Sequence, residues 1–309
     1  MKYKILITTS SFDLRNFYQL DDLISVGVEV ILNPFKRRLT EQEVSDLLSG
    51  NVVGMIAGLE PLTAGALQNA RQLKVIARCG TGLDSVDLNA ARDQGILVFN
   101  TPDAPTTAVA ELTVAHILGL LRHISESDRK IRAGQWNGIM GSLLKNKTVG
   151  IIGFGRIGQA VAKLVSAFEA TVIAFDTQTI SYPNVEQLSL DELCSNSDII
   201  SLHVPYSQDT HHLIGNYALN KMKPTALLIN VSRGGLINES ALLAALNNNL
   251  IAGAALDCFE SEPYSGPLLK FDNVQVTAHM GSYARETRDR MEIDASTALV
   301  GSLREQGIL

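Results

Sequence analysis

The sequence has few cysteines, few aromatic residues and no excess of basic side chains. The three cysteines, Cys79, Cys194 and Cys258, form no CxxC pair and cannot all be paired with one another. We therefore expect no disulfide framework, no cysteine-based metal site and a reduced, cytoplasmic location. The 26 Lys and Arg are outnumbered by 32 Asp and Glu, which gives a formal net charge of -6. This balance predicts no nucleic-acid partner, because phosphate backbones select strongly basic faces.

Long hydrophobic runs are missing as well. The most apolar stretch, Val109 to Leu121, contains Glu111 and His116 and is too short to span a bilayer. The chain also passes from Met1 directly into an apolar, strand-like segment without a small-residue cleavage site. These features predict neither a membrane partner nor a signal peptide.

What the sequence does contain is a regular alternation of short apolar runs with amphipathic stretches. This pattern is typical of βα units around a parallel sheet. The predicted strands are Lys4–Thr8, Val28–Leu32, Val52–Ala57, Leu73–Ala77 and Ile96–Phe99 in a first group, and Thr148–Gly153, Thr171–Phe175, Ile199–His203, Ala226–Asn230, Ala252–Leu256 and Val274–Thr277 in a second. Between the groups, residues 100–105 contain two prolines and read as a hinge.

The length of 309 residues is too great for one ordinary core, so two domains are expected. The six strands of the second group match a complete doubly wound dinucleotide fold. The one helix predicted after Ser282, Arg285 to Arg304, cannot form a domain by itself. We therefore predict an α/β protein with two doubly wound parallel sheets. One domain, with the doubly wound Rossmann form, covers residues 102–282, and a second, discontinuous domain covers residues 1–101 and 283–309.

One long helix is predicted from Thr107 to Ile131, and its first half is apolar on all sides. A helix of that kind must be covered all round. Either the two domains of one chain bury it or it forms a subunit interface, and the sequence leaves both open. Because closed two-fold pairs are the commonest oligomers, we predict a homodimer.

A glycine-rich motif follows the first strand of the second group and opens an amphipathic stretch. It reads Gly153-Phe154-Gly155-Arg156-Ile157-Gly158. The three glycines allow a tight turn, approach of a pyrophosphate to the backbone, and close packing of helix on strand. Asp176 ends the next strand, where a carboxylate accepts hydrogen bonds from a ribose 2′-hydroxyl and repels a 2′-phosphate. The motif therefore predicts NAD as the cofactor.

Polar residues follow three successive strands of the same group: Arg233, Asp257 and His279, with Glu262 five residues after Asp257. A histidine beside an apolar strand is more often structural. Together, however, these residues suit oxidation of a 2-hydroxy acid or reduction of a 2-oxo acid. Histidine exchanges the hydroxyl proton, a carboxylate orients the ring, and arginine binds the substrate carboxylate. The remaining histidines show no metal-ligand spacing, so no metal site is predicted.

The chain resembles the D-isomer-specific 2-hydroxy acid dehydrogenases and, within them, the phosphoglycerate dehydrogenases. The resemblance extends from about Leu73 to Gly281 and leaves the first fifty residues out. It rests on the segments Arg78–Leu88, Asn100–Pro102, Ala110–Thr113, the glycine motif, Asn230–Gly235, Ala255–Pro263 and Thr277–Gly281.

The resemblance implies a role for each matching residue. His279 would be the acid/base with Glu262 as its partner, and Arg233 would orient the substrate. Glu260 is the rival carboxylate, but the family's catalytic acid directly precedes a proline, as Glu262 does. Further residues would bind substrate or cofactor: Arg78 and Gly80 with Arg233 and His279 at the substrate, Asp257 at the nicotinamide carboxamide, Thr81, Val231 and Gly281 along the cofactor channel, and Val204 on the adenine side.

The resemblance also implies that residues 102–282 form the Rossmann NAD-binding domain and that residues 1–101 and 283–309 form a flavodoxin-like substrate (lid) domain. It further implies a dimer through the cofactor domain and a cleft that closes over substrate. We expect a short form, without the regulatory domains of longer phosphoglycerate dehydrogenases. The basic residues expected around a substrate phosphate are partly missing, since 57–60 and 136–140 contain none. Hydroxypyruvate or glyoxylate reduction is therefore the alternative within the family. An NAD(H)-sensing binding protein on the same fold is the alternative outside enzymes, and formate oxidation is disfavoured because it removes no hydroxyl proton.

Overall fold

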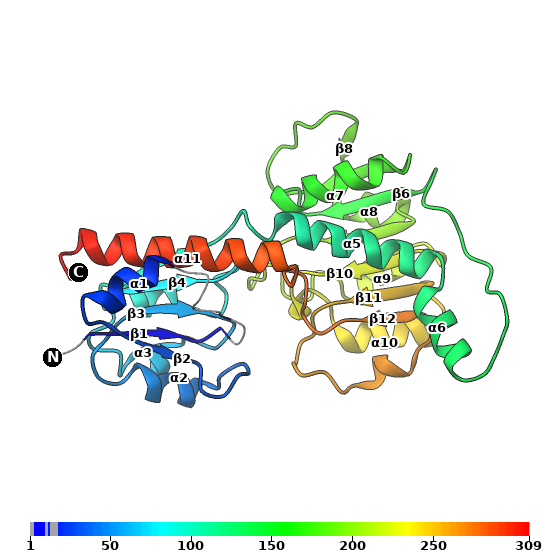
Figure 1. Cartoon of the computed structure of the whole chain (residues 1–309). Coiled ribbons are helices and arrows are strands. Elements are labelled where there is room, and N and C mark those ends of the chain that lie inside the picture. Colours follow the sequence, from blue (N-terminus) through cyan, green and yellow to red (C-terminus); the bar gives the residue numbers. More distant parts are fainter. Residues whose placement is uncertain (1–2, 10–11, 13–17, 309) are drawn as a thin grey trace. The chain divides into compact units, whose positions relative to one another are not determined.

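The structure is a computed structural model that describes residues 3–9, 12 and 18–308. It divides into two compact units, one made of Met1–Pro105 with Ser282–Leu309 and the other of Thr106–Gly281 (Figure 1). Each unit is an α/β structure built on one fully parallel sheet. The predicted fold class is confirmed.

Unit 1 contains a five-stranded sheet in the order β2-β1-β3-β4-β5, the flavodoxin-like order. One face packs against α1 and α11, and the other against α2, α3 and α4. The strands are β1 (Lys4–Ile7), β2 (Glu29–Leu32), β3 (Val52–Ala57), β4 (Val75–Arg78) and β5 (Leu97–Asn100), and the helices are α1 (Tyr18–Ser25), α2 (Glu41–Leu48), α3 (Ala64–Leu67), α4 (Leu88–Asp93) and α11 (Arg285–Glu305). All six residues of the central strand β3 are buried, as expected for a strand covered on both faces.

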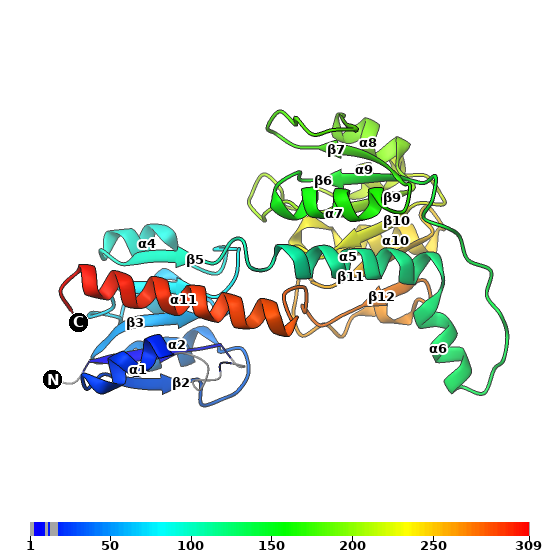
Figure 2. The same ribbon diagram turned by 45° about the horizontal axis from the view of Figure 1, so that its top comes forward.

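Helix α11 comes from the end of the chain and lies along the sheet of unit 1 in both ribbon views (Figure 2). Its buried side chains include Met291, Leu299 and Leu303. A Cβ added at Gly54 of β3 would lie 2.8 Å from Leu299 Cδ1, so the glycine permits this close approach of helix to strand. The core of unit 1 is therefore built from both ends of the sequence.

Unit 2 contains a seven-stranded sheet in the order β12-β11-β10-β9-β6-β7-β8. This is the doubly wound dinucleotide-binding order with one further strand at the β12 edge. The strands are β6 (Thr148–Ile152), β7 (Thr171–Phe175), β8 (Val185–Gln187), β9 (Ile199–Leu202), β10 (Leu227–Asn230), β11 (Gly253–Leu256) and β12 (Val274–Val276). Six of them were predicted, and the short edge strand β8 was missed.

Two layers of helices cover the sheet of unit 2. Helices α5 (Thr106–Leu121) and α7 (Arg156–Ser166) pack on one face, and α8 (Leu190–Asn196), α9 (Asn216–Lys221) and α10 (Glu239–Asn247) pack on the other. Short 3-10 turns η2 (Gly234–Leu236) and η3 (Pro267–Lys270) complete the unit. Both faces are covered, as they must be in a parallel sheet with apolar residues on each side.

The predicted single helix from Thr107 to Ile131 is wrong. Helix α5 ends at Leu121, and α6 (Ile124–Arg132) starts after a bend of 62° (Figure 2). His123, between them, has a left-handed backbone with φ of 53°, which an α-helix cannot continue through. Helix α5 is covered by α7 and by strands β10, β11 and β12 of its own unit. Its apolar surface is therefore explained inside unit 2.

The three cysteines are all buried and none forms a disulfide. Burial raises the pKa of the Cys79 and Cys194 thiols to about 11 and that of Cys258 well above its ordinary value. Among residues 3–9, 12 and 18–308, no single helix is long and apolar enough to cross a membrane, and only the bent pair α5 and α6 passes by length and composition. The same residues contain no His, Cys, Asp or Glu cluster suited to a metal ion.

Candidate active site

The glycine turn after β6 brings together features that suit a dinucleotide. Gly153 has φ of +91°, and a Cβ there would lie 2.7 Å from the carbonyl of His203. A Cβ at Gly158 would lie 2.2 Å from the Gly153 oxygen, so neither position has room for a side chain. At Gly155, by contrast, a Cβ would meet nothing within 4 Å. The backbone at Gly155 is therefore open to a ligand, beside the start of α7 at Arg156.

Asp176 lies directly after β7 and faces this turn. Its Oδ2 accepts a hydrogen bond of 2.7 Å from the Phe154 N–H, and its Oδ1 accepts one of 2.9 Å from the Gln178 N–H. Arg156 and Ile157 are the first two residues of α7, and Gly155 precedes them without a side-chain cap. A helix N-terminus with uncapped N–H groups favours an anion such as a pyrophosphate. The residues of this edge thus fit a dinucleotide cofactor.

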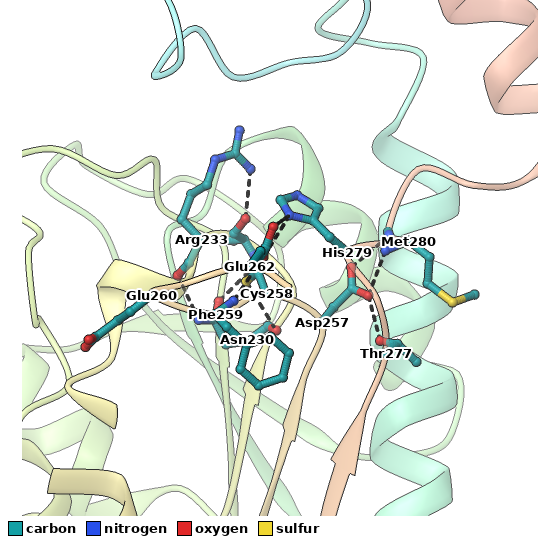
Figure 3. Close-up of polar contacts among 12 residues, drawn as sticks. Asn230, Arg233, Asp257, Cys258, Phe259, Glu260, Glu262, Thr277, His279 and Met280 are labelled. Atoms are coloured by element: carbon teal, nitrogen blue, oxygen red, sulfur yellow. Dashed lines mark hydrogen bonds and ion pairs between the residues drawn. The ribbon is translucent and has the colours of Figure 1, made fainter. Parts of the chain in front are cut away.

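The structure brings together His279 and Glu262, the two residues that the resemblance implies as an acid/base pair. His279 Nδ1 lies 3.0 Å from Glu262 Oε2 and 3.1 Å from Oε1 (Figure 3). The Phe259 N–H donates to Glu262 Oε1 at 3.1 Å, which orients the carboxylate toward the ring. His279 has φ of 50°, a left-handed backbone that is rare for a residue with a side chain. Such strain persists where the surroundings impose it, often at functional sites.

Asp257 braces the turn that carries His279. The side chain is 1% exposed, and its Oδ1 accepts from Thr277 Oγ1 at 2.6 Å and from the Met280 N–H at 2.8 Å. Its Oδ2 accepts from the Gly281 N–H at 2.8 Å. The carboxylate therefore fixes the backbone directly after His279 and the Thr277 side chain before it. The role at the nicotinamide that the resemblance implies stays a prediction.

Arg233 follows β10 at the same edge of the sheet, and its guanidinium extends in the same direction as the His279 ring (Figure 3). Its Nη1 donates to the Ser232 oxygen at 2.8 Å, and the Asn230 amide donates to the Arg233 oxygen at 2.8 Å. A Cβ at the next residue, Gly234, would lie 1.8 Å from the Phe259 carbonyl carbon. The loop that carries Glu262 thus packs directly on the backbone beside Arg233.

The other predicted residues divide between the two units. Val204 follows β9, and its Cγ1 would lie 2.7 Å from a Cβ added at Gly153. Val231 is buried beside β10, and its oxygen lies 3.9 Å from a Cβ added at Gly281.

Arg78, Gly80 and Thr81 belong to unit 1, at the carboxyl end of β4. A Cβ at Gly80 would lie 1.4 Å from Arg78 Nη1, so the arginine lies against the glycine backbone.

The family model described as the D-isomer specific 2-hydroxyacid dehydrogenase, NAD binding domain, matches residues 114–281. The chain belongs to this family. It is 42% identical to a glyoxylate reductase of Thermofilum pendens over 259 residues, which are 79% of the chain and 76% of that relative. It is 35% identical to a D-3-phosphoglycerate dehydrogenase of Synechocystis sp. over 94% of the chain, but it spans only 54% of that relative. The crystal structure of the TT0316 protein of Thermus thermophilus matches with a TM-score of 0.89 and 36% identity, covering 98% of the chain and 97% of that structure.

Membership in the 2-hydroxyacid dehydrogenase family makes the protein an oxidoreductase with an NAD(P)-binding domain that acts on small 2-hydroxy or 2-oxo acids. Relatives named for glyoxylate and for phosphoglycerate are similarly close, so the resemblance to phosphoglycerate dehydrogenases in particular is not distinctive.

Two histidines of this dehydrogenase contact residues near the candidate site in a way that could not be recognised in the sequence. His116 on α5 lies 3.2 Å from Thr277 Oγ1, which itself bonds Asp257, and burial lowers the pKa of His116. His212 lies 2.8 Å from Glu260 Oε1. Both histidines lack any sequence motif, because their partners are more than 45 residues away.

Proposed function

We propose that the protein reduces a small, unphosphorylated 2-oxo acid such as glyoxylate or hydroxypyruvate to its D-2-hydroxy acid, with NADH as the preferred cofactor. The observation that carries this proposal is the His279–Glu262 pair beside Arg233, at the edge of the sheet that also holds the glycine turn. A paired imidazole and a guanidinium are the groups that reduction of a 2-oxo acid requires.

Each of these side chains has a separate task in the proposed reaction. Arg233 donates hydrogen bonds to the substrate carboxylate and carbonyl oxygen. Glu262 accepts from His279 Nδ1, so that Nε2 is the nitrogen that gives a proton to the carbonyl oxygen as it becomes a hydroxyl. In the opposite direction Nε2 takes that proton back, and Glu262 stabilises the imidazolium that results. The dinucleotide, when bound along the glycine turn, supplies or accepts the hydride.

The preference for NADH over NADPH is inferred from Asp176. Its carboxylate lies at the glycine turn, bonded to the Phe154 N–H at 2.7 Å. A carboxylate there attracts a ribose hydroxyl and repels a 2′-phosphate, and the following residue, Thr177, offers no positive charge.

The proposed lack of a phosphate requirement is inferred from unit 1. A dianion needs cations or donors around it, because burying it without them is prohibitive. Arg78 is the basic residue that the resemblance assigns to the substrate. On β4 it lies opposite Ala57 of the neighbouring parallel strand β3. Three residues further on, Glu60 is 1% exposed, and burial raises the pKa of its carboxyl, although the charge of Arg78 opposes this shift. Residues 57–60 therefore add no positive charge to that of Arg78 for a phosphate.

Steady-state specificity constants test the substrate. With NADH held constant, we expect kcat/KM for glyoxylate or hydroxypyruvate to equal or exceed kcat/KM for 3-phosphohydroxypyruvate. A preference for the phosphorylated compound above about a hundredfold, nearly 3 kcal/mol, would contradict the proposal. NADH binding without turnover of any 2-oxo acid would instead favour the nucleotide-sensing protein.

We also propose a homodimer, on grounds other than those the sequence suggested. The apolar surface of α5 is covered inside unit 2, but Trp136, Met140 and Leu143, between α6 and β6, are 87%, 92% and 68% exposed. Exposed apolar side chains gathered on one segment mark an interaction surface, and a two-fold pair of identical chains is the commonest solution. Sedimentation at micromolar concentration should give the dimer mass, and a monomer mass would overturn the proposal.

A further inference from the structure

A second histidine–carboxylate pair lies on the loop that carries Glu262. The loop from Asp257 to Pro263 presents Glu262 to His279, and two residues earlier it presents Glu260 to His212 at 2.8 Å. The sequence suggested these two carboxylates as rivals for one role. The structure gives each its own histidine.

The hydrogen bonds around His212 determine which ring nitrogen donates. Asn238 Oδ1 accepts from the Ala241 N–H at 2.8 Å, so its amide nitrogen faces His212 Nδ1 at 3.2 Å. An amide nitrogen can only donate, and Nδ1 therefore accepts. The proton of the neutral ring is then on Nε2, which donates to Glu260 Oε1.

The same carboxylate and its backbone join the loop to the start of α10. Glu260 Oε1 also accepts from the Glu239 N–H at 3.2 Å, and the Glu260 N–H donates to Glu239 Oε1 at 2.7 Å. On its other side the loop lies against Gly234, where a Cβ would be 2.3 Å from the Glu260 nitrogen. Glu260 is thus held from two directions.

His212 is itself fixed by its backbone. Its N–H donates to the Gly235 oxygen at 2.8 Å, and its φ of 52° is left-handed, like that of His279. The residue therefore joins three segments: the turn after Arg233, the start of α10, and the loop of Glu262. Nothing in the chemistry proposed above uses it.

We propose that His212 is a positioning residue, which acts through Glu260 to hold the Glu262 carboxylate in place against His279. This inference rests on the proposed function, because it gives Glu262 a part in turnover. Loss of the His212 donor removes one of the two hydrogen bonds to Glu260 Oε1 and leaves the loop held by Glu239 and by its packing on Gly234. Glu262 is then held less firmly against the His279 ring. Small misplacements of a catalytic group are known to cost much of its rate.

The test compares two substitutions of His212 in the full chain. His212→Phe removes the donor, whereas His212→Gln keeps an amide donor of similar reach. With glyoxylate and NADH, we expect His212→Phe to lower kcat about tenfold with little change in KM or in NADH affinity. His212→Gln should recover most of the loss. Equal kcat in His212→Phe and the unchanged protein would overturn the proposal, as would a loss that His212→Gln does not relieve.

A matched control comes from a similar pair elsewhere in unit 2. His123 also has φ of 53° and lies 3.2 Å from Glu126 at the start of α6. His123→Phe therefore makes the same chemical change at a site outside the proposed machinery, and we expect unchanged kcat. If it lowers kcat as much as His212→Phe does, the effect is general and the proposal fails.

A double-mutant cycle separates this inference from the proposed function. If His212 acts through Glu262, then His212→Phe should cause little further loss of kcat in a Glu262→Gln background. Additive losses would mean that His212 acts elsewhere, which overturns the inference alone. Full activity of Glu262→Gln by itself would overturn the role of Glu262 in the proposed function. If His212→Phe fails to fold, the same comparison can be made at Glu260, the acceptor of the hydrogen bond. Glu260→Ala removes the acceptor oxygen and should lower kcat, whereas Glu260→Gln keeps an acceptor and should recover most of the loss.

Discussion

Asp176 is the residue on which the proposed cofactor preference depends. Its two oxygens accept backbone N–H groups of Phe154 and Gln178, which place the carboxylate at the glycine turn before any ligand binds. A side chain held in this way loses little entropy when it meets a ribose hydroxyl.

We therefore expect Asp176→Ala to narrow the preference for NADH over NADPH, chiefly because it weakens NADH binding. The affinity for NADH should fall about 10- to 100-fold, which corresponds to the loss of a hydrogen bond to a charged group. Fluorescence titration with each reduced cofactor measures it. Equal binding of the two cofactors by the unchanged protein would mean that the carboxylate does not face the ribose.

At the same scale, the sequence located the catalytic candidates but not their surroundings. Arg233, Asp257 and His279 could be predicted because strand ends are readable and the carboxyl ends of parallel strands share one edge. The partnership of Glu262 with His279 depended on a resemblance, since spacing along a loop does not say which way a side chain points. The bracing of the His279 turn by Asp257 was not predictable, because it depends on backbone N–H groups.

Among the elements, the glycine turn and its helix α7 make the sharpest prediction. A Cβ at Gly155 meets nothing within 4 Å, whereas a Cβ at Gly158 would lie 2.2 Å from a backbone oxygen. Gly155→Ala should therefore leave thermal unfolding nearly unchanged while it lowers NADH affinity about tenfold or more. Gly158→Ala should instead destabilise the protein by about 1–3 kcal/mol, because overpacked sites force the backbone to shift.

The two variants are controls for each other. Thermal unfolding without ligand and NADH titration, carried out on both, distinguish loss of binding from loss of packing. Destabilisation by Gly155→Ala equal to that by Gly158→Ala would show that the space beside Gly155 is not open, which would remove the basis for a ligand site there.

The elements that the sequence predicted well are those covered on both faces. Strands β3, β6 and β9 appear in the sequence as continuous aliphatic runs, and the structure buries them almost completely. The edge strand β8 was missed because it has only three residues, two of them exposed polar side chains. The break between α5 and α6 was missed because a left-handed histidine carries no hydrophobicity signal.

For the molecule as a whole, the buried Glu60 predicts how stability depends on pH. Burial raises its pKa above the ordinary value of 4.5, although hydrogen bonds from Thr8 and from the Gly58 N–H oppose this. A carboxyl group with a raised folded-state pKa contributes stability that is fully present below the unfolded-state pKa. That stability is lost as the pH rises through the folded-state pKa.

Thermal unfolding at pH 5 and pH 9 should therefore show that the melting temperature of the unchanged protein falls relative to that of Glu60→Gln as the pH rises. Glu43→Gln in the same unit is a matched control, because a hydrogen bond from Arg37 lowers the pKa of Glu43 to about 2. The difference in melting temperature between Glu43→Gln and the unchanged protein should be the same at both pH values. Parallel behaviour of Glu60→Gln and Glu43→Gln would contradict the account of Glu60.

The central claim is that His279, oriented by Glu262, exchanges the substrate proton, and turnover of His279→Ala tests it most directly. With glyoxylate or hydroxypyruvate and NADH, we expect kcat to fall roughly 10²–10⁴-fold, the usual contribution of a positioned acid/base. NADH affinity, measured by titration on the same sample, should stay nearly unchanged because the nucleotide contacts that we propose are at the glycine turn and Asp176. Turnover equal to that of the unchanged protein would contradict the assignment.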